Sequence, residues 1–78
     1  MTVYKNLGGD SGVVTYVKEP DSMTVTFRDG WSYLYTTHSA SPEKINKMQS
    51  LAAGGIGLHG YINTSLKYQY EAKTPPTN

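Results

Sequence analysis

Residues 23–36, MTVTFRDGWSYLYT, decide the fold that this chain can adopt. The stretch begins by alternating apolar side chains with threonines, which is the two-residue period of a half-buried strand. Asp29-Gly30 then favours a tight turn, because glycine tolerates the positive φ that hairpins require, and the aromatic run after it predicts a returning strand. Together with the β-branched run VVTYVK at 13–18, the sequence predicts a three-stranded antiparallel meander over 13–36.

The length of this turn decides which side of the sheet the aromatic rings occupy. A two-residue loop places the rings of the returning strand beside Arg28 and the threonines, as an exposed platform on which single-stranded bases could stack. A three-residue turn with Gly30 in the left-handed conformation places them on one face with the apolar residues of the preceding strand. We favour the second register, because buried rings stabilise a small domain more than an exposed stack does. Its pairs are Phe27 with Trp31, Val25 with Tyr33, and Met23 with Tyr35.

A helix is predicted within SPEKINKMQSLAAGG, residues 41–55. Ser41 can cap the first turn, Pro42 suits the first helical position, and apolar residues three and four apart provide a face to pack on the sheet. A glycine-rich loop at Gly54–Gly60 and a last strand around Leu66–Tyr70 are expected to follow. The expected fold class is α+β, a small antiparallel β-meander with one α-helix packed on the sheet and a final C-terminal strand.

The length of 78 residues gives room for one small domain. Residues 1–12 are expected to form a flexible N-terminal arm, 13–70 a single α+β domain, and 71–78 a flexible tail. No apolar run approaches the ~18 residues of a membrane helix, and the lack of cysteine fits a reducing compartment. We therefore expect a cytoplasmic protein without membrane contact, whose formal net charge of +1 provides no strong field for nucleic acid.

The motifs in the sequence do not predict catalysis. Gly55–Gly60, GIGLHG, matches the dinucleotide pattern G-x-G-x-x-G, but it follows a predicted helix rather than a strand, so a turning loop explains it better. A nest of glycine N–H groups that holds an anion is the remaining alternative. His38 and His59 suit acid–base chemistry near neutral pH, but neither belongs to a recognisable metal-binding or nucleophile pattern. We expect no enzyme activity, no metal and no cofactor.

Three short motifs follow one another along the chain, one before the predicted helix, one within it and one after it. They are Val25-Thr26-Phe27-x-x-Gly30-x-x-Tyr33-Leu34-Tyr35, a helix with Leu51 and Ala53, then Gly60-Tyr61-Ile62-Asn63-Thr64-Ser65-Leu66 and Tyr68. This order resembles the KTSC domain family, which has a central Tyr-x-Tyr motif, a following helix and a later Gly-x-aromatic-x-Asn segment. The resemblance implies a small α+β unit like those at the C-terminus of some lysyl-tRNA synthetases and in free-standing bacterial and phage proteins. The synthetase association implies RNA binding.

We therefore expect a small non-enzymatic module that binds RNA. The alternative is a protein-interaction or inhibitory module, such as a small phage protein acting on a host protein. Exposed edge strands would also allow copies of the chain to pair as a homo-oligomer. A structural role, with the rings in the interior, is expected for Phe27, Gly30, Trp31, Tyr33 and Tyr35. The residues expected to contact the partner are Arg28, His59, Tyr61, Asn63 and Lys67.

Overall fold

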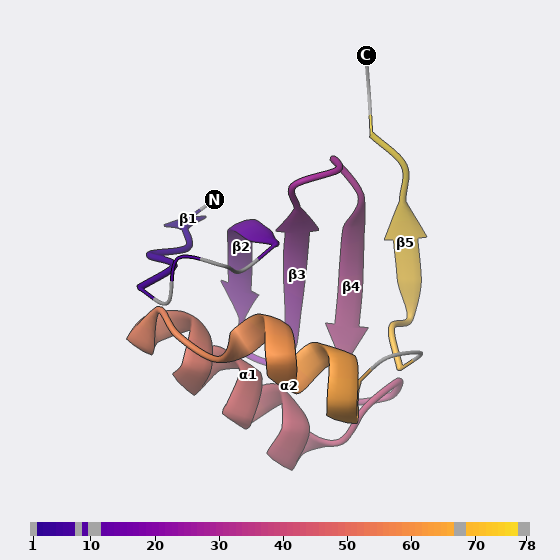
Figure 1. Ribbon diagram of the computed structural model, residues 1–78. Helices are drawn as coiled ribbons and strands as arrows, with labels where there is room; N and C mark the ends of the chain where they lie inside the picture. The colour runs from indigo at the N-terminus through magenta and orange to yellow at the C-terminus, as the bar shows by residue number, and fades with distance from the viewer. Residues whose placement is uncertain (1, 8, 10–11, 67–68, 77–78) are drawn as a thin grey trace.

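Five antiparallel strands form one sheet whose order follows the chain, β1-β2-β3-β4-β5. The computed structural model describes residues 2–7, 9, 12–66 and 69–76. Two helices between β4 and β5 pack on one face of the sheet (Figure 1). The architecture is α+β as predicted, with two helices instead of one. The elements are β1 (Thr2–Val3), β2 (Val13–Glu19), β3 (Ser22–Phe27), β4 (Ser32–Thr36), α1 (Pro42–Gly54), α2 (Leu58–Ser65) and β5 (Ala72–Thr74).

The β3–β4 hairpin has the three-residue turn that the sequence favoured. Val25 pairs with Tyr33, and the Phe27 N–H donates to the carbonyl oxygen of Trp31 at 2.9 Å. Gly30 closes the turn with a φ of 93°, a conformation that is costly for a residue with a Cβ atom. The tyrosines of β4 therefore lie on one face with the apolar residues of β3, and the predicted register is confirmed.

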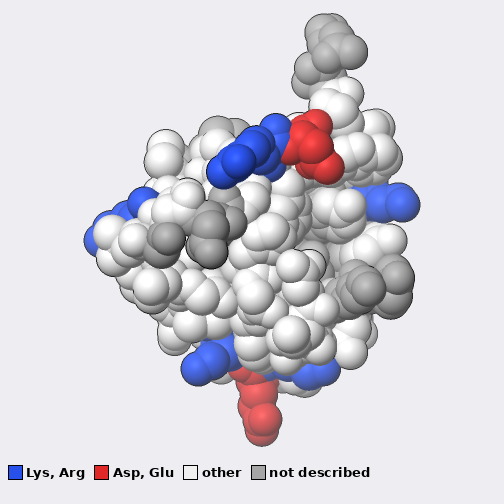
Figure 2. Space-filling view, in the orientation of Figure 1, with Lys and Arg blue, Asp and Glu red and all other residues white. Residues whose placement is uncertain are grey.

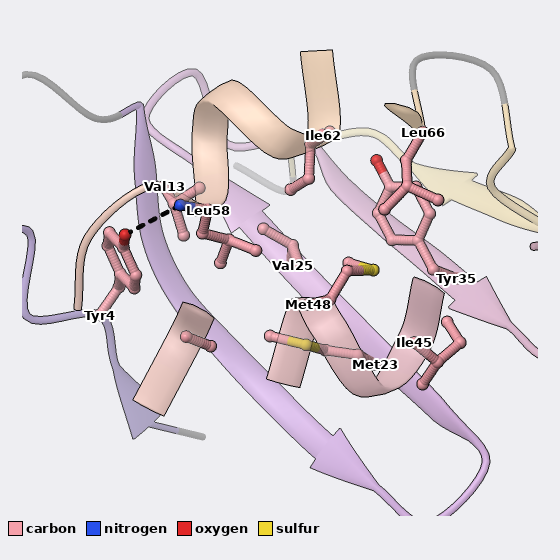
Figure 3. Packing of buried hydrophobic residues seen from close by; sticks show 11 residues of the cluster. Tyr4, Val13, Met23, Val25, Tyr35, Ile45, Met48, Leu58, Ile62 and Leu66 are labelled. Atoms are coloured by element: carbon pink, nitrogen blue, oxygen red, sulfur yellow. Dashed lines mark hydrogen bonds between the residues drawn. The ribbon is translucent and has the colours of Figure 1, made fainter. Parts of the chain in front are cut away.

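The core lies between the sheet and the two helices (Figure 3). Strand β3 contributes alternate residues and α1 contributes residues three and four apart, as the periods of strand and helix require. Tyr35 has only 1% of its surface exposed and is the largest of the fully buried side chains. The buried residues are Tyr4, Val13, Met23, Val25, Tyr35, Ile45, Met48, Ala52, Leu58, Ile62 and Leu66.

Helix α1 begins and ends as its capping residues predict. The hydroxyl of Ser41 accepts the backbone N–H of Lys44 at 3.3 Å, and Pro42 is the first helical residue. Gly55 takes the left-handed conformation with a φ of 78°, and its N–H donates to the carbonyl oxygen of Leu51 at 2.9 Å. The prediction of this helix is confirmed.

Helix α2 was not predicted, and it includes the last three residues, 58–60, of the loop expected at Gly54–Gly60. Leu58 and Ile62, four residues apart, bury the same face of the helix in the core. The strand expected around Leu66–Tyr70 is wrong for residues 66, 69 and 70, which are not in a strand, while 67–68 lie outside the described residues. The final strand is β5, which starts at Ala72.

The first turn of α2 is capped by Tyr4, a residue of the N-terminal segment. Its N-cap residue, Gly57, has a φ of 86° and no side chain that could accept a hydrogen bond. Instead, the hydroxyl of Tyr4 accepts the backbone N–H of Leu58 at 3.3 Å (Figure 3). Because unpaired N–H groups at a helix start are costly when buried, this contact joins the formation of α2 to the docking of the N-terminal segment.

Both terminal segments contribute to the sheet. Strand β1 pairs with β2, and Tyr4, which follows β1, is only 4% exposed. Strand β5 pairs with β4 and lies within 71–78, the segment expected to be a tail. The sheet thus extends beyond the predicted 13–70 at both ends. Among the described residues, no helix is long and apolar enough to cross a membrane.

Candidate functional site

A cleft of about 380 Å³ opens where the β3–β4 turn and the residue before β2 meet α2. We call it the aromatic cleft. The sheet provides one wall, α2 provides the opposite wall, and the turn forms the rim. Its volume falls within the ~300–1,000 Å³ typical of sites that hold small molecules.

The sheet wall consists of aromatic rings that contact one another edge to face. Phe27 and Tyr33 lie on neighbouring strands with ring centroids 5.4 Å apart and planes at 85°. Tyr70, between α2 and β5, does not line the cleft but packs against Tyr33, with ring centroids 5.0 Å apart. Tyr35 lies deeper and contacts Tyr70 at 6.5 Å. Because edge-to-face contacts are favourable, the wall is a preformed apolar surface.

Tyr35 brings an uncharged hydroxyl to the base of this wall. Burial raises the pKa of Tyr35 above its ordinary value, and the neighbouring phenols of Tyr33 and Tyr70 raise it further. In Figure 3 its hydroxyl points toward the side of the core where Ile62 and Leu66 lie. The phenol therefore stays protonated and uncharged at neutral pH.

The helix wall is formed by residues one turn apart on α2. His59, Ile62 and Asn63 have the spacing that places side chains on one helix face, and all three line the cleft. The Nδ1 atom of His59 accepts the backbone N–H of Gly12 at 2.8 Å. An accepting Nδ1 carries no proton, so this contact assigns the neutral imidazole with its proton on Nε2. The ring of His59 packs against that of Phe27, with the ring centroids 5.6 Å apart.

Gly12 is required for this contact by its lack of a side chain. A Cβ atom at residue 12 would lie 2.9 Å from Cε1 of His59, closer than carbon atoms pack. The Gly12 carbonyl oxygen also accepts the N–H of Arg28 at 2.7 Å. The backbone at residue 12 thus joins the helix wall to the rim.

Among the described residues that line the cleft, Arg28 and Asp29 bring one charge of each sign to its rim. Asp29 Oδ1 accepts the N–H of Trp31 at 3.1 Å, which gives it the turn-forming role that the sequence indicated. On the face that Figure 2 shows, basic side chains are scattered, and those that the structure describes form no broad patch of one sign. With a formal net charge of +1 for the chain, long-range attraction of a polyanion is weak.

Three of the five predicted contact residues come together in the cleft. Arg28, His59 and Asn63 line it. Tyr61 does not line it and packs, half-buried, against the core. Lys67 lies outside the described residues.

The predicted structural residues divide between the fold and the cleft. Phe27, Tyr33 and Tyr35 line the cleft as well as packing on or in the core, and Gly30 forms the turn. The expectation that the Trp31 ring lies in the interior is wrong, because Trp31 is not a member of the core cluster. It is half-buried at the end of the sheet, with Lys73 Nζ 5.4 Å from its ring centroid. Its position at the turn places it beyond the reach of the helices.

Sequence reasoning missed Gly12, Ile62 and Tyr70 as parts of this region. Each depends on contacts between distant segments, and α2 itself was not predicted. The spacing of Leu58 and Ile62, four residues apart, was the available signal for the helix. It would have placed His59 and Asn63 together.

The glycine-rich segment is less suited to an anion than its motif suggested. Gly55 N–H donates to carbonyl oxygens of α1, and Leu58 N–H donates to the Tyr4 hydroxyl. Two of the amides that a nest would use are thus already paired. In the part of the chain that the structure describes, no group of three His, Cys, Asp or Glu residues could hold a metal ion.

Comparison with protein-family models, with curated proteins and with solved structures finds no match to this chain. The resemblance to KTSC domains therefore stays a prediction.

Proposed function

We propose that this chain is a non-enzymatic binding module that holds single-stranded RNA at the aromatic cleft. The observation that carries the proposal is the pairing of a preformed aromatic wall with polar side chains on the opposite wall and a guanidinium at the rim. Single-strand binders combine aromatic surfaces that take bases with cations that meet the backbone. A cytoplasmic location is part of this proposal, and the resemblance to KTSC domains supports it.

The charges predict binding that is modest and only weakly dependent on salt. The formal net charge is +1, and the described residues of the rim include one cation, Arg28, and one anion, Asp29. A protein that neutralises only one or two phosphates has a shallow salt dependence, since each neutralised phosphate of a single strand contributes a slope of about −0.7. Aromatic contacts must then provide most of the affinity.

A salt titration of a short fluorescein-labelled single-stranded RNA, followed by anisotropy, tests the proposal. We expect binding at low salt, and Arg28→Gln should weaken it and reduce the salt slope by about one phosphate equivalent. The matched control is Lys47→Gln, which removes the same charge from an exposed position of α1 outside the cleft. Wild-type protein that retains no RNA at low salt would refute RNA binding.

Binding or inhibition of another protein is the second candidate function. The observation that favours it is the balance of charge, both over the chain and at the rim of the cleft. Protein surfaces that bind other proteins are commonly aromatic and low in charge. A wild-type chain that does not bind RNA but binds a protein through Tyr33 and Asn63 would support this candidate instead.

A further inference from the structure

We propose that the aromatic cleft receives one unpaired base of the bound strand, with the base against Phe27 and Tyr33 and its polar edge toward His59 and Asn63. In this arrangement Asn63 is a specificity-determining residue, because its amide is the group that meets the base edge. The inference rests on the proposed function and names what enters the site.

The interior of the cleft selects an uncharged group. His59 is neutral because its Nδ1 accepts the Gly12 N–H, and the phenol of Tyr35 is held in its protonated form by burial. Asn63 is neutral by its chemistry. The two charged side chains, Arg28 and Asp29, belong to the rim. Among the described residues that line the cleft, none in the interior offers a phosphate a counter-charge, whereas the neutral polar groups there match the edge of a base.

The two walls match the two kinds of surface that a base presents. The ring faces of a base are apolar and polarisable and suit the aromatic wall. The edge of a base carries donors and acceptors, and the helix wall offers both. Asn63 has an exposed amide with a donor and an acceptor side by side, and His59 provides an Nε2–H donor one turn away.

The orientation of His59 is fixed before any ligand binds. The bond to Gly12 holds the imidazole in one tautomer, and the Phe27 ring at 5.6 Å limits its rotation. Preorganised donors lose little freedom on binding, so they contribute more to affinity than mobile ones do. The cleft volume of about 380 Å³ is suited to one nucleotide-sized group and excludes a duplex.

The test uses short RNA strands that carry one base or none. One strand keeps a single central base with abasic ribose at the other positions, and the second is abasic throughout. We expect wild-type protein to bind the one-base strand at least about fivefold more tightly, the lower bound for loss of one base stack. Asn63→Ala should reduce this preference, while Asn46→Ala, which removes an exposed asparagine from α1, should leave it unchanged.

The outcomes separate this inference from the proposed function. If intact RNA binds but the one-base strand binds no more tightly than the abasic strand, the base site is refuted while RNA binding stands. The same holds if Asn63→Ala weakens the binding of both strands equally. If free nucleoside monophosphates compete for the protein as effectively as the one-base strand, and Asn63→Ala weakens this competition, the base site is supported and strand binding is refuted. A chain that binds neither strand nor nucleotide would overturn both.

Discussion

Replacing Tyr4 by phenylalanine should destabilise the protein although it removes only one oxygen atom. The hydroxyl accepts the N–H of Leu58 at 3.3 Å in a buried position, and Gly57 offers α2 no alternative side-chain cap. A buried N–H left unpaired costs ~1–3 kcal/mol. Because this bond is longer than the usual ~3.0 Å, we expect a loss of about 1–2 kcal/mol, in the lower part of that range.

Thermal and urea unfolding, followed by circular dichroism, measure this loss. In a domain of this size, 1 kcal/mol corresponds to about 4–8 °C in Tm, so the expected decrease for Tyr4→Phe is about 5–15 °C. Tyr16→Phe is the matched control, since Tyr16 is a half-buried tyrosine of β2 whose hydroxyl has no hydrogen-bond partner among the described residues. The backbone amide of Leu58 should also exchange faster in Tyr4→Phe. If the free energy of unfolding of Tyr4→Phe lies within about 0.3 kcal/mol of the wild-type value and the Leu58 amide exchanges at an unchanged rate, the capping role of Tyr4 is refuted.

Three further predictions concern the turn, the buried phenol and α1. Gly30→Ala should lower the free energy of unfolding by about 1–3 kcal/mol, because φ is 93° and the new Cβ would lie 2.6 Å from that of Pro76. The control is Gly54→Ala, whose new Cβ would meet nothing within 4 Å. It should raise the free energy of unfolding by about 0.5–1 kcal/mol in the same urea assay. Since the pKa of Tyr35 is raised on folding, its contribution to stability should be complete below about pH 10 and decline above it, where the unfolded phenol loses its proton first. Urea midpoints across alkaline pH should fall less steeply for Tyr35→Phe than for wild type, and equal slopes would contradict the shift. Ser41→Ala should cost about 1 kcal/mol through loss of the N-cap, and an unchanged midpoint would show that another group replaces it.

The features predicted correctly are those that short stretches of sequence determine. The turn at Gly30 and the alternation before it specify the register, because a shift by one residue would move every side chain to the other face. Helix α1 carries a capping residue at one end and a glycine at the other. Each signal lies within a few residues of the element that it specifies.

The features that were missed depend on segments far apart in the chain. Helix α2 has a glycine at its N-cap and Gly60 within it, and such residues weaken the local signal for a helix. Its first N–H is satisfied by Tyr4, from a segment that the sequence indicated to be a flexible arm. The aromatic cleft needs α2 as its second wall, so its contact residues could be named from the sequence but not assembled.

The order of the elements along the chain also has a consequence for how the protein folds during synthesis. Strands β2, β3 and β4 pair with their neighbours in sequence, so this part can form while the chain is still leaving the ribosome. Tyr4 is translated before Leu58, so its hydroxyl has no partner in α2 until Leu58 has been added to the chain. The core therefore stays incomplete in the nascent chain until α2 has been translated, and a pause in translation before α2 would prolong the exposure of the apolar face of the sheet.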